Sequence, residues 1–186
     1  MPPIGRTPPH RQSGRVSWLT LGLVTSESRL ESGPGWYIDR ETLLPVIEDV
    51  NLFRAFYVDD PVVEILIALW TGRPDEAENQ LYEELASSDS PRLRALLADA
   101  WRDQGRPDDA IGAYEQLVQE VLGTTHEAVM QQHLGKALFV AGRHEEAAKA
   151  FEKALRLRSE AGADESLVRS SRMAAERAHE AARTTT

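Results

Sequence analysis

Histidine and serine are the residue types of this 186-residue chain that could bind a metal or act as a nucleophile. The five histidines are widely separated and form no H-E-x-x-H or closely spaced set, so they predict no metal site: His10, His126, His133, His144 and His179. Ser87, Ser88 and Ser90 lack the G-x-S-x-G setting of a nucleophile. Cysteine is absent, which excludes a thiol nucleophile, a disulfide framework and a thiolate-held metal. No glycine-rich phosphate-binding motif occurs. The sequence therefore predicts a protein that is not an enzyme and has no cofactor.

Paired carboxylates, the remaining candidates for acid–base chemistry, occur in a six-residue phrase that the chain repeats three times, beginning at Gly72, Gly105 and Gly142. The phrase reads Gly-Arg, then Pro or His, then two acidic residues and Ala, and its glycines lie 33 and 37 residues apart. Glycine takes the left-handed conformation that ends a helix, and Pro74 and Pro107 fit the first position of the next helix. The acidic pair then faces the positive end of the helix dipole. We therefore interpret these carboxylates as structural.

The helices around each phrase carry matching residues, which indicates a repeating pair of helices. Residues at matching offsets precede the second and third glycines: Leu97, Ala98 and Trp101, then Leu134, Gly135 and Leu138. Large residues follow the three phrases at matching or adjacent offsets: Leu81 and Leu85, then Tyr114 and Leu117, then Phe151 and Leu155. This helix-turn-helix period of about 34 residues resembles the tetratricopeptide repeat family. The resemblance covers residues 59–160 and is weakest in the first unit, where Glu64 occupies a site that the family usually fills with leucine.

The resemblance implies an all-α fold: an α-α superhelix (solenoid) of three tetratricopeptide-like helix hairpins with a flanking helix at each end. We expect the units at about 59–90, 91–123 and 124–160, and a C-terminal capping helix over 164–182. Four extra residues separate the second and third glycines, and Thr124 and Glu127 nearby have the spacing of a capping box. Apolar residues recur every three to four positions between residues 42 and 57 and predict a helix there. No strand is expected after residue 36.

The helical domain is expected to span residues 36–183, because residues 1–35 are rich in proline, glycine and arginine and predict a disordered tail. Within this tail, Val16–Val24 is an apolar run that follows three arginines in the order of a signal peptide, but no A-x-A cleavage site follows it. Four interpretations are left open: a signal, a disordered tail, a start-site artefact and a short apolar segment that docks elsewhere.

The charge balance bears on partners and location. A formal net charge of -9 argues against nucleic acid and anionic lipid as partners, because those affinities come mostly from cations that meet phosphates. Basic or neutral partners fit better. No run reaches about eighteen apolar residues, so no membrane span is predicted. We expect a cytoplasmic protein, with secretion through residues 1–26 as the alternative.

The repeat register also predicts which residues line a concave groove, where the resembling family usually holds a peptide or a partner's helix. The candidate groove residues are Leu66, Leu69, Arg92, Asp99, Arg102, Gln132, Lys136 and Phe139. An alternative is that these charges satisfy one another, with Asp99 paired to Lys136 and Arg102 stacked on Phe139. Some family members grip a terminal carboxylate with a fixed set of residues, but that set is absent: Val62, Leu66, Leu96 and Val129 occupy four of its places.

The expected function is a non-catalytic module that binds a peptide or helix of a partner protein in this groove. The alternative is a regulatory or assembly subunit that associates with itself or with a larger complex through its apolar first unit. Oligomerisation is possible under either hypothesis and is not implied by the sequence.

Overall fold

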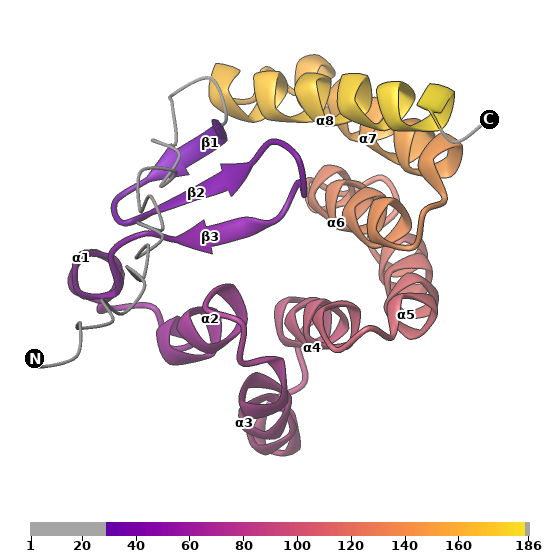
Figure 1. Cartoon of the computed structure of the whole chain (residues 1–186). Helices are drawn as coiled ribbons and strands as arrows, with labels where there is room; N and C mark the ends of the chain where they lie inside the picture. Colours follow the sequence, from indigo (N-terminus) through magenta and orange to yellow (C-terminus); the bar gives the residue numbers. More distant parts are fainter. Residues whose placement is uncertain (1–28, 185–186) are drawn as a thin grey trace, which may run out of the picture.

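The computed structural model describes residues 29–184, which form a short sheet followed by an arc of helices (Figure 1). The strands are β1 (Arg29–Gly33), β2 (Trp36–Asp39) and β3 (Pro45–Ile47). The helices are α1 (Val50–Phe56), α2 (Val63–Trp70), α3 (Pro74–Ser87), α4 (Pro91–Asp103), α5 (Pro107–Glu120), α6 (Glu127–Val140), α7 (His144–Glu160) and α8 (Glu165–Thr184). From α2 onward each helix packs on the next, so the predicted solenoid of helix hairpins is confirmed.

The three repeated phrases form three nearly identical turns between the helices of each pair. Gly72, Gly105 and Gly142 have φ angles of 78°, 78° and 75°. In each turn the arginine after the glycine donates its backbone N–H to the carbonyl five residues earlier, over 2.8 to 2.9 Å, which satisfies a carbonyl left free at the helix end. The next helix begins one residue later, at Pro74, Pro107 or His144.

The same arginines neutralise one acid of each repeated pair. Arg73 forms an ion pair with Glu76 at 2.6 Å and Arg106 with Asp109 at 2.8 Å, and Arg143 pairs with Glu146 in the same way. These contacts join residues three apart across the first turn of the helix. The carboxylate pairs therefore have the structural role that the sequence indicated.

Small residues let the two helices of each hairpin approach closely. The alanine that ends each phrase is fully buried: Ala77, Ala110 and Ala147. In the third hairpin, a Cβ atom added to Gly135 on α6 would lie 2.6 Å from the ring of Phe151 on α7, which is itself fully buried. Gly135 is therefore required by packing, since an interior glycine otherwise costs helix stability.

The N-terminal sheet was not expected, and the prediction of a helix over 42–57 is wrong. The strands are antiparallel in the order β1-β2-β3, and the only helical part of that segment is α1. Pro45 begins β3, and Leu43 before it has a φ of 61°, outside the helical region. Asp49 then caps α1 by accepting hydrogen bonds from the backbone N–H groups of Asn51 and Leu52.

Tertiary contacts explain why the sheet forms despite the helical spacing. Leu30, Ile38 and Leu43 are buried in one core cluster with residues of α4 to α8, and Trp36 packs against this cluster and against the cluster around α2. Arg177 of α8 also pairs with Glu41 of the β2–β3 loop at 3.1 Å. The sheet thus connects the last helix of the arc to the first hairpin, in the place where the sequence predicted a flanking helix.

The predicted tail boundary is corrected in the same way. Residues 29–35, assigned to a disordered tail, form β1 and the turn into β2, in which Gly35 has a φ of 78°. The apolar run Val16–Val24 lies outside the described residues. At the other end, α8 ends the arc and buries a stripe of small residues: Ser170, Ser171, Ala174, Ala175, Ala178 and Ala181.

Candidate binding cavity on the concave face

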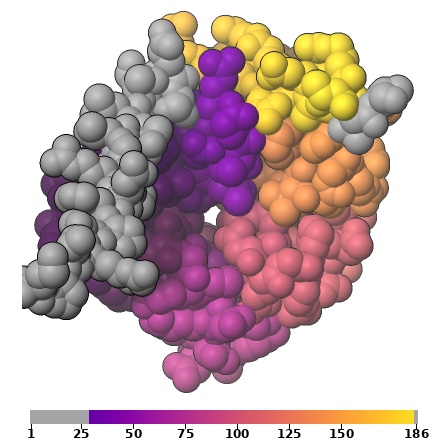
Figure 2. Space-filling view, viewed as in Figure 1, coloured from indigo at the N-terminus to yellow at the C-terminus, as the bar shows by residue number. Residues whose placement is uncertain are grey.

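The sheet lies across the open side of the helical arc, and its residues line the larger of two adjoining cavities on the concave face. Their volumes are about 690 Å³ and about 530 Å³, and Trp70, Asp99, Val129 and His133 line both. Figure 2 shows an opening between the strands and the helices, near the centre of the molecule. The concave face is therefore a partly enclosed chamber and not an open trough.

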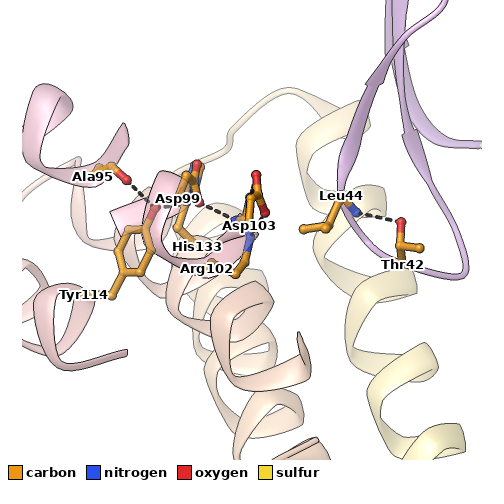
Figure 3. Close-up of polar contacts among 8 residues, drawn as sticks. All are labelled: Thr42, Leu44, Ala95, Asp99, Arg102, Asp103, Tyr114 and His133. Atoms are coloured by element: carbon orange, nitrogen blue, oxygen red, sulfur yellow. Dashed lines mark hydrogen bonds and ion pairs between the residues drawn. The ribbon is translucent and has the colours of Figure 1, made fainter. Parts of the chain in front are cut away.

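Asp99 and His133, which line both cavities, belong to a largely buried polar cluster (Figure 3). Asp99 of α4 forms a short ion pair with Arg102, whose other nitrogens donate to the carboxylate of Asp103 at 2.8 and 3.0 Å. The hydroxyl of Tyr114 on α5 lies 2.8 Å from Asp99 Oδ1 and 2.6 Å from the Ala95 carbonyl oxygen. His133 Nδ1 of α6 lies 3.4 Å from Asp99 Oδ2. Asp99 therefore holds three helices together.

The protonation states in this cluster follow from mutual charge. Burial alone would raise the pKa of Asp99, but the charge of Arg102 and the contact with His133 outweigh burial and hold the pKa of Asp99 below its usual range. Burial and the neighbouring Asp99 charge raise the pKa of Tyr114 well above 10. The pair Asp99–Arg102 is therefore ionised and Tyr114 is neutral at any physiological pH.

Lys136 of α6 and Arg158 of α7 face the larger cavity from its other side. Lys136 makes no hydrogen bond or ion pair with any residue in the part of the chain that the structure describes, and burial lowers its pKa to about 8. Arg158 donates from Nη1 to Ser171 Oγ at 2.8 Å and to the Leu167 carbonyl at 3.0 Å. Ser171 in turn donates to Gln132 Oε1 at 2.7 Å, which fixes the position of Arg158 relative to α6.

Two tryptophans form the aromatic wall of the larger cavity. Trp36 of β2 and Trp70 of α2 have ring centroids 5.4 Å apart, and Trp36 Nε1 donates to the Tyr57 hydroxyl at 2.9 Å. Leu157 and Leu167 line the same cavity from α7 and α8. The cavity thus combines apolar walls with a few ionic groups, the composition typical of ligand sites.

The structure divides the eight predicted groove residues into two groups. Leu66, Arg92, Asp99 and Lys136 line the cavities. The other four lie in internal contacts: Leu69 in the core of the first hairpin, Arg102 in its ion pairs, Gln132 on Ser171, and Phe139 against His144 and Arg177. The role of the first group in binding stays a prediction.

The alternative pairing scheme is wrong in its partners. Asp99 is held by Arg102 and His133, while Lys136 acts on it through space without an ion pair. Arg177 of α8, and not Arg102, lies over the Phe139 ring, 5.6 Å from its centroid. The charges on α4 are therefore satisfied internally, and that of Lys136 is not.

The sequence reasoning missed most residues that line the larger cavity, among them the polar or aromatic Glu31, Trp36, His133 and Arg158. Glu31 and Trp36 belong to the unexpected sheet. His133 is next to the predicted Gln132 on α6, so a prediction that included the residues adjacent to each groove position would have found it. Arg158 lies on the second helix of its hairpin, where a rule restricted to first helices finds nothing.

Within residues 29–184 no helix is both long and apolar enough to cross a membrane, and no cluster of three or more His, Asp or Glu side chains could hold a metal ion.

These features define a class: an α-helical repeat protein whose concave face is covered by its own N-terminal sheet. Residues 89–160, which include α4 to α7, match the family model described as tetratricopeptide repeat. Residues 89–160 therefore contain tetratricopeptide repeats, as the repeated phrase and its flanking helices indicated. Repeats of this family generally mediate protein–protein interaction. No curated protein and no solved structure gave a significant match to the chain.

Proposed function

We propose that this chain is a non-catalytic interaction module that binds an extended segment of a partner polypeptide in the chamber beneath the sheet. The observation that carries the proposal is the pair of adjoining cavities, which are lined by α2, α4 and α6, the first helices of the three hairpins. Repeat arrays use this face as their binding surface. Repeats two and three, which match the family, supply most of these residues.

The division of the chamber into two cavities favours an extended segment over a helix, because neither cavity by itself is large enough for two helical turns. Two turns of α-helix with side chains form a cylinder about 10 Å across and about 11 Å long, roughly 850 Å³. Neither cavity, at about 690 Å³ and about 530 Å³, holds that volume. An extended chain of a few residues fits without displacing the sheet.

The experiment compares two substitutions on one helix. Val129 and Val140 both lie on α6 with 39% and 42% of their surface exposed, but Val129 lines both cavities and Val140 lines neither. Peptides selected from a random display library on the wild-type protein are tested by calorimetry against Val129→Arg and Val140→Arg. We expect at least a tenfold loss of affinity for Val129→Arg and no change for Val140→Arg. Equal binding by both variants, or no selected peptide of micromolar affinity, contradicts the proposal.

A second candidate function is self-association or assembly into a larger complex, which the sequence assigned to the apolar first unit and which the structure favours at α1, directly before that unit. The apolar residues of α2 are covered by the chain itself, but Leu52, Phe56 and Val58 at α1 are 49%, 62% and 67% exposed. Leu52 and Phe56 are four residues apart and therefore lie on one face of α1, and exposed apolar side chains of this kind occur at protein contacts. Light scattering at micromolar concentration distinguishes the two: a strict monomer excludes self-association, and a dimer that Phe56→Asp dissociates supports it.

A further inference from the structure

The larger cavity contains two cations that the fold does not neutralise directly. Lys136 has no hydrogen-bond or ion-pair partner among residues 29–184, and Arg158 directs one nitrogen to Ser171 and Leu167 and has no ion pair there. Each is buried enough for desolvation to lower its pKa, and the charge of Arg158 lowers the pKa of Lys136 further. Arg158 is buried and Lys136 is half-buried, and an unpaired cation removed from water is costly, so an anion that enters the cavity stabilises it.

The acidic groups around these cations form no ion pair with either of them. Asp99 is held by Arg102, His133 and Tyr114. Glu31 of β1 lines the same cavity and acts on Lys136 and Arg158 through space, but forms an ion pair with neither. Glu160 lies exposed at the rim of the cavity. Between Lys136, Arg158 and Glu31 there is thus a space that is electrostatically suited to one anionic group.

The rest of the cavity is suited to an apolar body. Trp36 and Trp70 form one wall and Leu157 and Leu167 another, and the volume of about 690 Å³ lies within the range of about 300 to 1,000 Å³ for small-molecule sites. Aromatic rings packed on such walls bury a large apolar area. The ligand chemistry that matches both parts is an apolar group that carries a carboxylate.

We propose that the cavity beneath the sheet is a binding site for an organic carboxylate, with the carboxylate held by Lys136 and Arg158 and the apolar body against Trp36 and Trp70. The carboxylate belongs either to a small acid or to a residue of the bound peptide. In the second case the inference rests on the proposed function. This site differs from the set of residues with which some family members hold a terminal carboxylate. Four places of that set are occupied here by Val62, Leu66, Leu96 and Val129, and neither Lys136 nor Arg158 is at one of these four places.

The test uses a probe of this chemistry and its neutral analogue. Binding of N-acetylphenylalanine and of N-acetylphenylalanine amide to the full chain is measured by calorimetry at pH 7. Since hydrogen bonds to charged groups contribute about 1.5 to 3 kcal/mol, the amide is expected to bind about 10- to 100-fold more weakly than the acid. Lys136→Met should lose the same factor for the acid. Lys149→Met, at an exposed lysine of α7 outside the cavity, should bind as the wild type does.

Glu31→Gln is expected to raise the affinity for the acid probe, whereas Lys136→Met lowers it. Removal of the only carboxylate that the sheet presents to the two cations should tighten binding of the acid several-fold, whereas a merely structural Glu31 would leave it unchanged or weaken it.

The source of the carboxylate is distinguished with the selected peptides, each compared with a version whose carboxylates are replaced by amides. If peptide binding requires both the carboxylate and Lys136, and the small acid does not bind at millimolar concentration, the site is assigned to a peptide. If binding of the small acid requires Lys136 while peptide binding is unaffected by Val129→Arg, the carboxylate site is supported and the proposed function is refuted. Equal binding of acid and amide probes, together with peptides insensitive to Lys136→Met, overturns the inference.

Discussion

Gly135→Ala tests the close packing of α6 on α7, on which the third repeat unit depends. The new Cβ atom would lie 2.6 Å from two ring carbons of Phe151, whereas ordinary van der Waals contacts begin near 3.4 Å. Phe151 is fully buried, so its ring has no free space to enter. Overpacking of this kind costs about 1 to 3 kcal/mol. Against it stands the gain of about 1 kcal/mol from replacing glycine in a helix interior by alanine.

Gly112→Ala is the matched control, because Gly112 lies inside α5 and an added Cβ atom would meet nothing within 4 Å. This variant should gain about 0.5 to 1 kcal/mol of stability from helix propensity alone. Subtracting the effects of the two variants removes the propensity contribution and leaves the contact with Phe151. We therefore expect Gly135→Ala to be less stable than Gly112→Ala by about 1 to 3 kcal/mol.

Urea unfolding followed by circular dichroism measures this difference, with an unchanged m-value as the condition for comparing free energies. In thermal unfolding, 1 kcal/mol corresponds to about 2 to 4 °C for a chain of this size. Phe151→Leu in the Gly135→Ala background should recover part of the loss, since the two residues are in contact. Two glycine variants that stabilise the protein equally would refute the packing argument and the repeat register derived from it.

Three further predictions concern the ionic groups and a turn. Burial lowers the pKa of Lys136 from 10.5 to about 8, so between these pH values the unfolded chain binds a proton that the folded chain does not, and stability rises with pH. Lys136→Met should therefore be more stable than the wild type at pH 7, by on the order of 1 to 3 kcal/mol, and this difference should disappear near pH 10.5. Urea unfolding at the two pH values measures the difference, with Lys149→Met as the control. Asp99→Asn should cost about 3 to 5 kcal/mol in the same assay because it leaves Arg102 buried without its main counter-charge, and a loss below about 1 kcal/mol would contradict the cluster. Gly142→Ala should lower the stability by about 1 to 2 kcal/mol, since alanine is strained at a φ of 75°, and a melting temperature at or above that of the wild type would count against the turn geometry.

The repeat architecture could be predicted because its determinants are local. The phrase that begins at Gly105 places the left-handed residue, the helix-starting proline and the acids within six residues, and the turn forms from them alone. Helix ends follow from such phrases, and fully buried alanines such as Ala110 follow from the repeat period. The same locality let the family be identified before any packing was known, as the match over residues 89–160 confirms.

The candidate site could be predicted in part. The register placed Asp99 and Lys136 on the concave face, where both line the cavity. It also included Arg102 and Gln132, whose partners Asp103 and Ser171 bury them. Periodicity assigns a residue to a helix face, but which polar groups on that face satisfy one another depends on helices that are distant in the chain.

The sequence by itself therefore determined the helix pairs, their turns and the family, because those depend on interactions between residues a few positions apart. Only the tertiary structure decided how the concave face is covered. The apolar spacing over residues 42–57 is helical, but Pro45–Ile47 form β3, and Leu43 is buried in a core cluster with residues of the distant α5 to α8. This long-range packing of the N-terminal segment places Glu31 and Trp36 in the lining of the cavity that Lys136 and Arg158 also line.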